Sequence, residues 1–241
     1  MCKKIILFFI VFTVCFLGMN IVCLASKQEE MFLTANNLYE QKKYKQALDL
    51  YKKIEKKDSA LLYNIGNCEF CLGHYVAAII AWNKSKKGAA LGNLNDINHN
   101  ISVAYDKLGI SHEVSFWQEM KDIINSFFLF YLQLLFLIFW FLFFLVFMFI
   151  KKLRGLFLGF TLSLSFIFLS IVVIKYRLIR REEAIVTSAT SFFAGPNEKY
   201  HKLGDLSVAD KIIVQKKEKK WYKIDHDGVV GWVLIDHVEK V

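Results

Sequence analysis

The side chains that most often carry chemistry are scattered along this chain rather than grouped. Its six histidines show no spacing typical of metal ligands; they are His74, His99, His112, His201, His226 and His237. Asp225 and Asp227 lie at a predicted tight turn, where aspartate is common for conformational reasons. The sequence has no phosphate-binding loop, dinucleotide fingerprint or G-x-S-x-G motif. These patterns predict a protein that is not an enzyme and that needs no metal or cofactor.

Cys68 and Cys71 form the one closely spaced pair of thiols in the predicted helical region. A reactive pair with this spacing needs a helix N-terminus to lower a thiol pKa. This pair instead lies about two turns into a predicted helix. We therefore expect a structural pair, which an exported chain can join as a disulfide.

A second set of residue types is suited to binding rather than catalysis. Residues 35–54 and 66–85 align with an offset of 31, within the range for stacked helical repeats. In such stacks the first helix of each repeat lines a concave surface that takes peptides. The candidate peptide-binding residues are Phe32, Asn36, Tyr39, Tyr63, Asn67 and Phe70. The alternative is that the asparagines only satisfy local backbone groups.

Residues 27–122 resemble tetratricopeptide repeats, and the stretch LLYNIGNCEFCLGHYVAAIIAW is the closer of the two copies. The first copy departs from the family pattern at Thr34 and Ala35. A partial third copy at 97–109 is expected to supply a capping helix. In some members of this family a pair of asparagines, here Asn36 and Asn67, helps to hold a peptide's terminal carboxylate. That site also needs basic residues where this chain has Asp96 and Asn100, so the carboxylate clamp is not carried over.

From residue 182 to 241 the pattern changes to short strands, which predicts a small all-β barrel. Asp227-Gly228 predicts a tight hairpin between two of these strands. Phe192, Trp221 and Trp232 are expected to fill the core. The order W-Y-x-I followed by D-G-x-x-G-W-V resembles a bacterial SH3-like domain, although the usual asparagine-arginine pair before the Gly-Pro turn is missing. The resemblance implies binding of cell-wall peptides or protein partners, without catalysis.

Three apolar blocks complete the chain. Residues 1–25 predict an export signal cleaved after Ala25, with an uncleaved anchor as the alternative. Residues 126–150 and 156–174 are each long and apolar enough to predict a transmembrane helix. The link between them is so short that it requires an antiparallel hairpin, with both flanking domains on one face of the membrane. Neither block contains an ionisable residue, which argues against an ion or proton pathway.

The formal net charge of +9 does not predict nucleic-acid binding. The helical and barrel regions are each nearly balanced in charge, and the surplus lysines and all the arginines flank the apolar blocks. Basic residues in those positions are typical of membrane boundaries. No basic face of the kind that nucleic-acid binding requires is left.

The order of signal, helical repeats, transmembrane hairpin and SH3-like domain resembles the BatE-type proteins of the Bacteroides aerotolerance group. The resemblance implies a multi-pass protein of the bacterial inner membrane, with both modules on the periplasmic side. Its implied partners are the lipid bilayer and protein or peptide partners, in particular other Bat-type membrane proteins, in envelope stress tolerance. We therefore expect a non-catalytic scaffold that combines an all-α repeat domain, a transmembrane α-hairpin and an all-β barrel. The alternative is a cell-wall sensor or anchor that binds peptidoglycan through the barrel.

Overall fold

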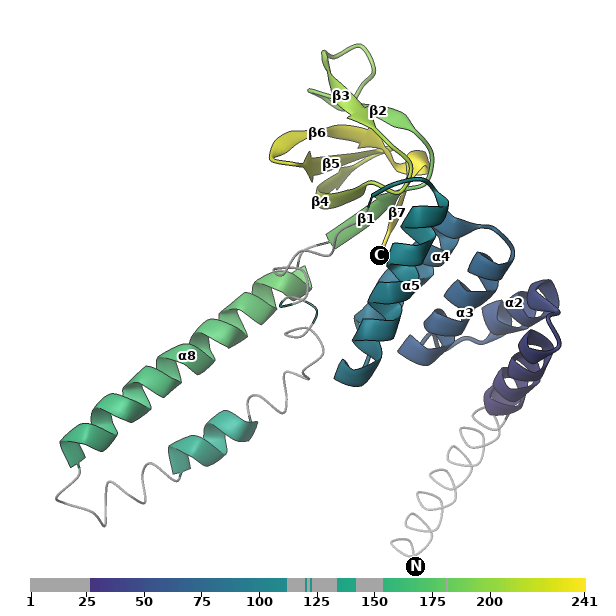
Figure 1. Ribbon diagram of the computed structural model, residues 1–241. Coiled ribbons are helices and arrows are strands. Elements are labelled where there is room, and N and C mark those ends of the chain that lie inside the picture. The colour runs from purple at the N-terminus through teal and green to yellow at the C-terminus, as the bar shows by residue number, and fades with distance from the viewer. Residues whose placement is uncertain (1–26, 112–119, 121, 123–133, 142–153, 181) are drawn as a thin grey trace, which may run out of the picture.

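The described parts of the protein are a helical part, a pair of antiparallel helical segments that we call the hairpin, and a small β-barrel (Figure 1). The computed structural model describes residues 27–111, 120, 122, 134–141, 154–180 and 182–241. The predicted export signal at 1–25 and most of the predicted span at 126–150 lie outside the described residues.

The helical part contains two antiparallel helix pairs followed by a single helix. A helix at residues 27–40 pairs with α2 (Tyr44–Lys53), and α3 (Ser59–Cys71) pairs with α4 (Tyr75–Lys86). A short 3₁₀ turn, η1 (Leu91–Asn93), leads into α5 (Leu94–Lys107). Asp58 begins α3 as an N-cap, because its carboxylate accepts a hydrogen bond from the Leu61 amide at 2.9 Å. The expectation of a helical N-terminal region is thus confirmed.

The turns between helices repeat with the sequence. Lys42 has φ 60° and Gly73 has φ 82°, so the turn within each helix pair contains one left-handed residue. Gly109 follows α5 in the same conformation, with φ 73°. Glycine adopts this conformation without steric cost, whereas lysine does not. The turn geometry is therefore shared by all three copies even where the residue type is not.

A small residue and a large ring meet in each helix pair. In the second pair, a Cβ added to Gly66 would lie 2.4 Å from Nε1 of Trp82, whose side chain is buried. In the first pair the aligned residues are Ala35 and Tyr51, both buried. The wider indole is thus accompanied by glycine, and the narrower phenol by alanine. This compensation explains why the first copy departs from the usual glycine.

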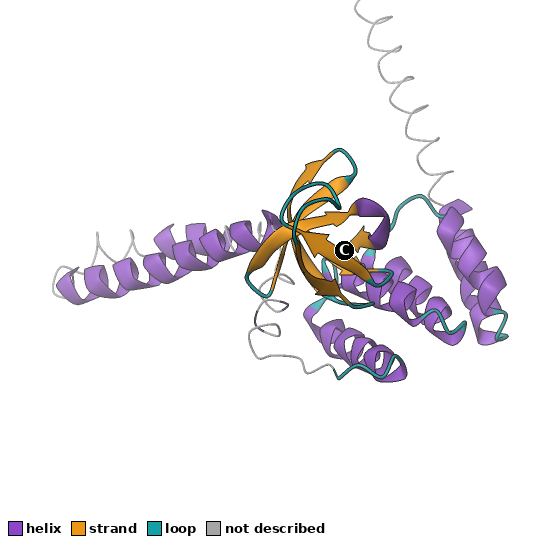
Figure 2. Ribbon diagram, turned by 90° about the horizontal axis from the view of Figure 1, so that it is seen from above, coloured by secondary structure: helices purple, strands orange, loops and turns teal. Residues whose placement is uncertain are grey.

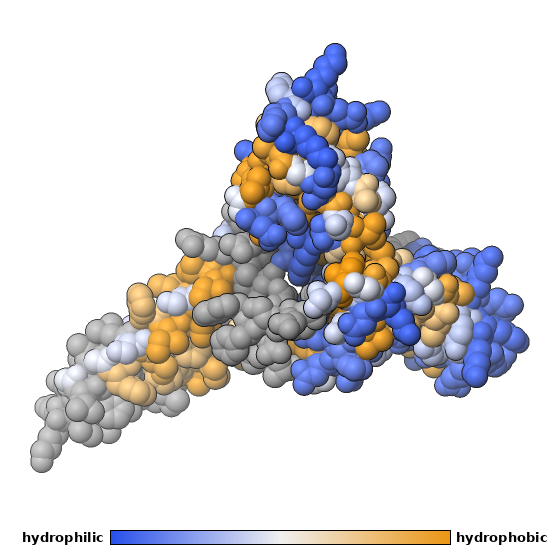
Figure 3. Space-filling view, turned by 45° about the horizontal axis from the view of Figure 1, so that its top comes forward, coloured by the Kyte–Doolittle hydropathy of each residue, from blue (hydrophilic) through white to orange (hydrophobic). Residues whose placement is uncertain are grey.

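The hairpin consists of a helical segment at 134–141 and of α8 (Arg154–Arg180). The rings of Phe136 and Phe168 lie 6.2 Å apart and those of Phe139 and Phe160 lie 6.5 Å apart, so the segments run antiparallel. Large apolar side chains are exposed along this part, which is largely orange in Figure 3. Within the stretches that the structure describes, no helix has both the length and the apolarity that crossing a membrane requires.

The C-terminal part is a strongly curved seven-stranded antiparallel sheet that forms a small barrel, with the strand order β3-β2-β6-β5-β4-β1-β7 (Figure 1). Its strands are β1 (Glu182–Val186), β2 (Thr190–Phe193), β3 (Lys202–Leu206), β4 (Lys211–Glu218), β5 (Trp221–His226), β6 (Val229–Leu234) and β7 (Val238–Lys240). Asp227 and Gly228 both have positive φ between β5 and β6, as the hairpin prediction required. The sequence pattern located β1, β4, β5 and β6, but it did not locate β2, β3 and β7.

The barrel core is built around Phe192 rather than around the tryptophans. Phe192 packs where two glycines leave room, since a Cβ on Gly204 or Gly231 would lie 2.8 or 2.5 Å from its ring. Trp221 and Trp232 are only partly buried and are not part of this core. The prediction that they fill the core is wrong. Ile224 and Val233 take the inward positions on β5 and β6, and strand alternation then turns both indoles outward.

The barrel packs directly on the helical part, although residues 108–181, which include the hairpin, separate α5 from β1 in the sequence. Figure 2 shows the strands beside the helices, with the hairpin leaving on the other side. Ile185, Ala209 and Val241 of the barrel lie in the same buried cluster as residues of α4 and α5. The two modules therefore share a hydrophobic core rather than being linked only through the hairpin.

Candidate functional site

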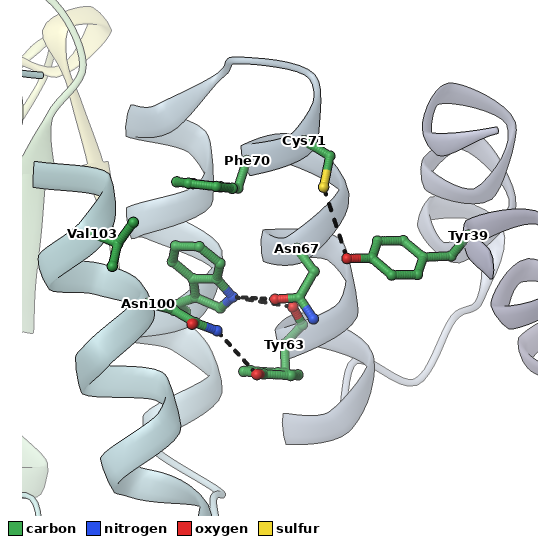
Figure 4. Close-up of a pocket in the computed structure, with 8 residues that line it drawn as sticks. Tyr39, Tyr63, Asn67, Phe70, Cys71, Asn100 and Val103 are labelled. Atoms are coloured by element: carbon green, nitrogen blue, oxygen red, sulfur yellow. Dashed lines mark hydrogen bonds between the residues drawn. The ribbon is translucent and has the colours of Figure 1, made fainter. Parts of the chain in front are cut away.

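The main candidate site is a groove across the first helices of the stack. It has a volume of about 350 Å³ and is lined by Tyr39, Tyr63, Asn67, Phe70, Cys71, Trp82, Asn100 and Val103. Figure 4 shows their side chains projecting into the space between α3, α5 and the helix at 27–40. A neighbouring hollow of about 260 Å³ extends it along Asn36, Tyr39, Glu40, Tyr51, Asn64 and Asn67. The groove thus runs over all three copies.

Two asparagines of the groove are held in the same orientation by equivalent rings. The Trp82 indole N–H donates to Oδ1 of Asn67 at 3.1 Å, and the Tyr51 hydroxyl donates to Oδ1 of Asn36. Because both carboxamide oxygens accept from the second helix, both Nδ2 groups are left as donors. Neither Nδ2 has a hydrogen-bond partner among the described residues. The groove therefore presents two pre-oriented amide donors in register with the repeat.

The third helix supplies the opposite wall. Asn100 Nδ2 donates to the Tyr63 hydroxyl at 3.0 Å, which leaves the Asn100 carboxamide oxygen as an acceptor (Figure 4). Val103 from α5 and Phe70 from α3 border the apolar end of the groove. The Phe70 ring lies 5.7 Å from that of Trp82. The site thus combines donors, one acceptor and an apolar recess.

Few formal charges line this groove. Among its described lining residues, the one carboxylate is Glu40, at the end near Asn36. Tyr51 and Tyr39 stay protonated at neutral pH, because burial raises the pKa of Tyr51 to about 12 and also raises that of Tyr39. A lining of amides, phenols and apolar rings suits an uncharged polar chain with an apolar side group.

Five of the six groove residues expected from the sequence line these hollows. The exception is Phe32, whose ring packs 5.8 Å from Tyr51 at the edge of a buried cluster. The groove also contains Asn64, Trp82, Asn100 and Val103, which the repeat alignment did not predict as lining residues. Asn64 and Asn100 occupy matching positions in NIGNCEFCLG and NISVAYDKLG, which is the signal that would have found them.

Cys68 and Cys71 are both free thiols, and they differ in environment. Cys68 is fully buried, and desolvation raises its pKa to about 12. Cys71 is exposed in the groove, with its sulfur 3.8 Å from the Tyr39 hydroxyl. A thiol that is buried and protonated is a poor nucleophile. Cys68 therefore has structural rather than reactive character.

A second candidate surface lies on the outer side of the barrel. Phe193 pairs with Trp232 across β2 and β6, and its ring lies 6.1 Å from that of Trp221 in an edge-to-face arrangement. Lys223 lies opposite Trp232 on the adjacent strand β5. We call Phe193, Trp221 and Trp232 the aromatic patch. Its rings are partly exposed and are not needed to fill the core.

Carboxylates, histidines and cysteines do not form a metal site in the described stretches. No group of three or more such residues is placed to hold an ion there. Glu69 is buried, but it is engaged by Lys52 and His74, each at 2.8 Å. This cluster is a structural ion pair network beneath the surface of α3.

Comparison with protein families identifies the domain type of the C-terminal part. Residues 188–239 match the family model for the bacterial SH3 domain. This match confirms the expected domain type for the barrel, and it covers most of the strands described above. A comparison with curated proteins finds no match for the chain.

Proposed function

We propose that this protein is a non-catalytic recognition protein whose helical groove binds an extended, uncharged peptide segment of a partner protein. The observation that carries the proposal is the shared orientation of Asn36 and Asn67. Their oxygens are occupied by Tyr51 and Trp82, so both amides offer N–H groups to the groove. Main-chain carbonyls of an extended peptide are the natural acceptors for such donors.

The rest of the groove specifies the ligand class. The Asn100 carboxamide oxygen offers an acceptor for a peptide N–H, and the recess at Phe70 and Val103 fits one bulky apolar side chain. An acidic peptide is disfavoured, since the lining supplies no cation and has Glu40 at one end. The ligand is thus a neutral segment with an apolar anchor, rather than a terminal carboxylate.

Asn67→Ala is expected to weaken binding of such peptides about tenfold, because a buried donor to the ligand is lost. The probes are capped peptides, meaning ten-residue peptides acetylated at the N-terminus and amidated at the C-terminus, and each carries a central Phe, Leu, Ala, Asp or Lys. Fluorescence polarisation with the full chain measures affinity. Phe and Leu peptides are expected to bind, and Asp peptides are not.

Asn37→Ala is the matched control, since Asn37 is exposed on the same helix as Asn36. It is expected to leave affinity unchanged. Equal effects of the Asn67 and Asn37 variants, or preferred binding of the Asp peptides, would contradict the proposal.

A second candidate function uses the barrel. Bacterial SH3 domains often bind peptidoglycan or proteins, and the aromatic patch is the surface here that suits a flat ligand face such as a sugar ring. Trp232→Ala is expected to reduce retention of the full chain on isolated peptidoglycan at least fivefold. Its free energy of unfolding should change by no more than about 1 kcal/mol, because Trp232 lies outside the core. Unchanged retention would contradict a role for the patch.

We further propose that the hairpin tethers both modules to a bacterial inner membrane, on the periplasmic side. The apolar sequence of 126–150 and 156–174 supports this, as do the exposed rings along α8. The docking of barrel on helices supports the same-face arrangement, since both modules must lie on one side to touch. Protease digestion of spheroplasts, with tags after Ser111 and Val241, should remove both tags; protection of either would contradict it.

A role as scaffold in a Bat-type complex rests on domain order alone. It predicts that the full chain, solubilised in detergent, co-purifies with von Willebrand A-type membrane subunits. Recovery of the chain without them would contradict this role and leave the groove proposal to its own test.

A further inference from the structure

The barrel packs against α5, the last helix of the aligned repeats. Repeat stacks bury the apolar face of each unit against the next, and they need a cap at each end. Helix α5, which belongs to the partial third copy, is the last helix that the aligned repeats supply. Ile101, Ala104 and Tyr105 of α5 are nevertheless buried. Ile185, Ala209 and Val241 of the barrel belong to the same buried cluster, and Tyr105 contacts Ala209 directly, so part of the α5 surface is buried against the barrel.

Polar contacts fix this docking in one orientation. The Tyr105 hydroxyl donates to the main-chain oxygen of Ala209 at 2.9 Å, in a buried position. Burial raises the pKa of Tyr105 to about 12, so the donor is present throughout the physiological range. At the rim, Lys84 forms an ion pair with Glu239, and Lys87 donates to the main-chain oxygen of Val241.

The receiving loop is itself held in a defined shape. Ala209 has φ 70°, an unusual conformation for alanine, and its amide donates to the Val186 oxygen at 2.8 Å. Asp210 accepts from the Ser207 amide at 2.7 Å across the same turn. A strained residue persists only where its surroundings determine it. The turn thus presents its carbonyl to Tyr105 from a fixed position.

The same helix carries one wall of the groove. Asn100 and Val103 face the groove, whereas Tyr105, two residues after Val103, faces the barrel. A shift of α5 would separate Asn100 from Tyr63 and open the recess beside Phe70. The position of this wall therefore depends on what lies behind α5.

We propose that the SH3 barrel is the cap of the helical stack, and that by holding α5 it completes the peptide groove. Tyr105 is then a positioning residue, which acts on the groove through α5 without touching a ligand. The two modules work as one recognition unit, and the groove is complete only when the barrel is docked. The link to peptide affinity rests on the function proposed above, whereas the capping role does not.

Hydrogen exchange of the full chain, followed by mass spectrometry, tests the capping role without any ligand. Tyr105→Phe and Lys84→Glu are each expected to speed exchange of α5 amides about tenfold, and those of the helix at 27–40 much less. The charge swap that combines Lys84→Glu with Glu239→Lys should restore slow exchange. Tyr75→Phe is the matched control, because the Tyr75 hydroxyl has no hydrogen-bond partner among the described residues. Unchanged α5 exchange in both interface variants, or no recovery in the swap, would overturn the capping role.

Affinity for the capped Phe peptide tests whether docking of the barrel positions the α5 wall of the groove. Interface variants with faster α5 exchange are expected to bind this peptide about fivefold more weakly, and the charge swap should recover most of the loss. Faster exchange with unaltered affinity would overturn the positioning of the groove wall. If the wild-type chain binds none of the capped peptides, the groove proposal fails, and the exchange result still decides the capping role.

Discussion

Gly66→Ala is expected to destabilise the protein by about 2 kcal/mol, although alanine is the better helix former. The gain in helix propensity is about 1 kcal/mol. Against it, the added Cβ would lie 2.4 to 2.9 Å from three atoms of the buried Trp82 ring. Overpacking of this kind costs about 1–3 kcal/mol, and more when the neighbour cannot move. The Trp82 indole is fixed by hydrogen bonds to Tyr63 and Asn67, so the steric term wins.

Trp82→Tyr in the same chain should restore most of that loss. The double variant reproduces the pair found in the first repeat, where Ala35 packs with Tyr51. Trp82→Tyr alone is expected to cost about 1–2 kcal/mol, because the smaller ring leaves space beside glycine. Urea denaturation followed by circular dichroism measures each variant. Additive losses in the double variant would contradict the proposed compensation between ring size and small residue.

Phe192→Ala is expected to lower the free energy of unfolding by about 3–5 kcal/mol, as for other buried aromatic residues. Phe192 is 4% exposed and fills the space that Gly204 and Gly231 leave open. A barrel this small has few other large side chains in its core. Loss of the barrel also removes the cover of α5, so we expect the helical part to lose stability in the same transition.

Phe193→Ala provides the matched control for Phe192. Phe193 lies on the same strand but on the outer side, with Trp221 and Trp232. Its removal should cost about 1 kcal/mol or less. Thermal unfolding of both variants, monitored by circular dichroism, distinguishes inner from outer positions. A larger loss for Phe193 than for Phe192 would contradict the inward and outward assignment of β2.

The residues of the helical groove could be predicted from the sequence because aligned positions of the repeats are structurally equivalent. Residues that align at an offset of 31, such as Asn36 with Asn67, occupy equivalent positions in the structure. Their partners Tyr51 and Trp82 align at the same offset and make equivalent hydrogen bonds. Periodicity thus predicted which residues share a face. It did not predict that the rings fix the amide orientation, which depends on contacts between helices.

The outward tryptophans show where local pattern fails in a small barrel. Trp221, Tyr222, Lys223 and Ile224 alternate, but residue type alone does not say which pair faces inward. The inner position belongs to Ile224, because the ring of Phe192 already fills the space under Gly231. The indoles of Trp221 and Trp232 therefore lie on the outer side of the barrel, where they form the aromatic patch with Phe193.

Docking of the barrel on α5 had no local signal at all. Tyr105 and Ala209 are separated by 104 positions in the sequence, and each reads as an ordinary helix or turn residue. Contacts of this kind follow from the shapes of two folded modules. The described segments at 134–141 and α8 run antiparallel, which is consistent with a chain that returns toward the helical part before the barrel begins.

The most direct test of the groove is NMR of the asparagine side-chain amides, with selective ¹⁵N-asparagine labelling of the full chain. Titration with the capped Phe peptide should shift the side-chain amide signals of Asn36 and Asn67 most strongly. The Asn100 signal should shift less, because its carboxamide oxygen accepts from the ligand while its Nδ2 stays bonded to Tyr63, and the exposed Asn37 and Asn95 should not move. Peptide binding with unshifted Asn36 and Asn67 signals would place the ligand elsewhere and contradict the account.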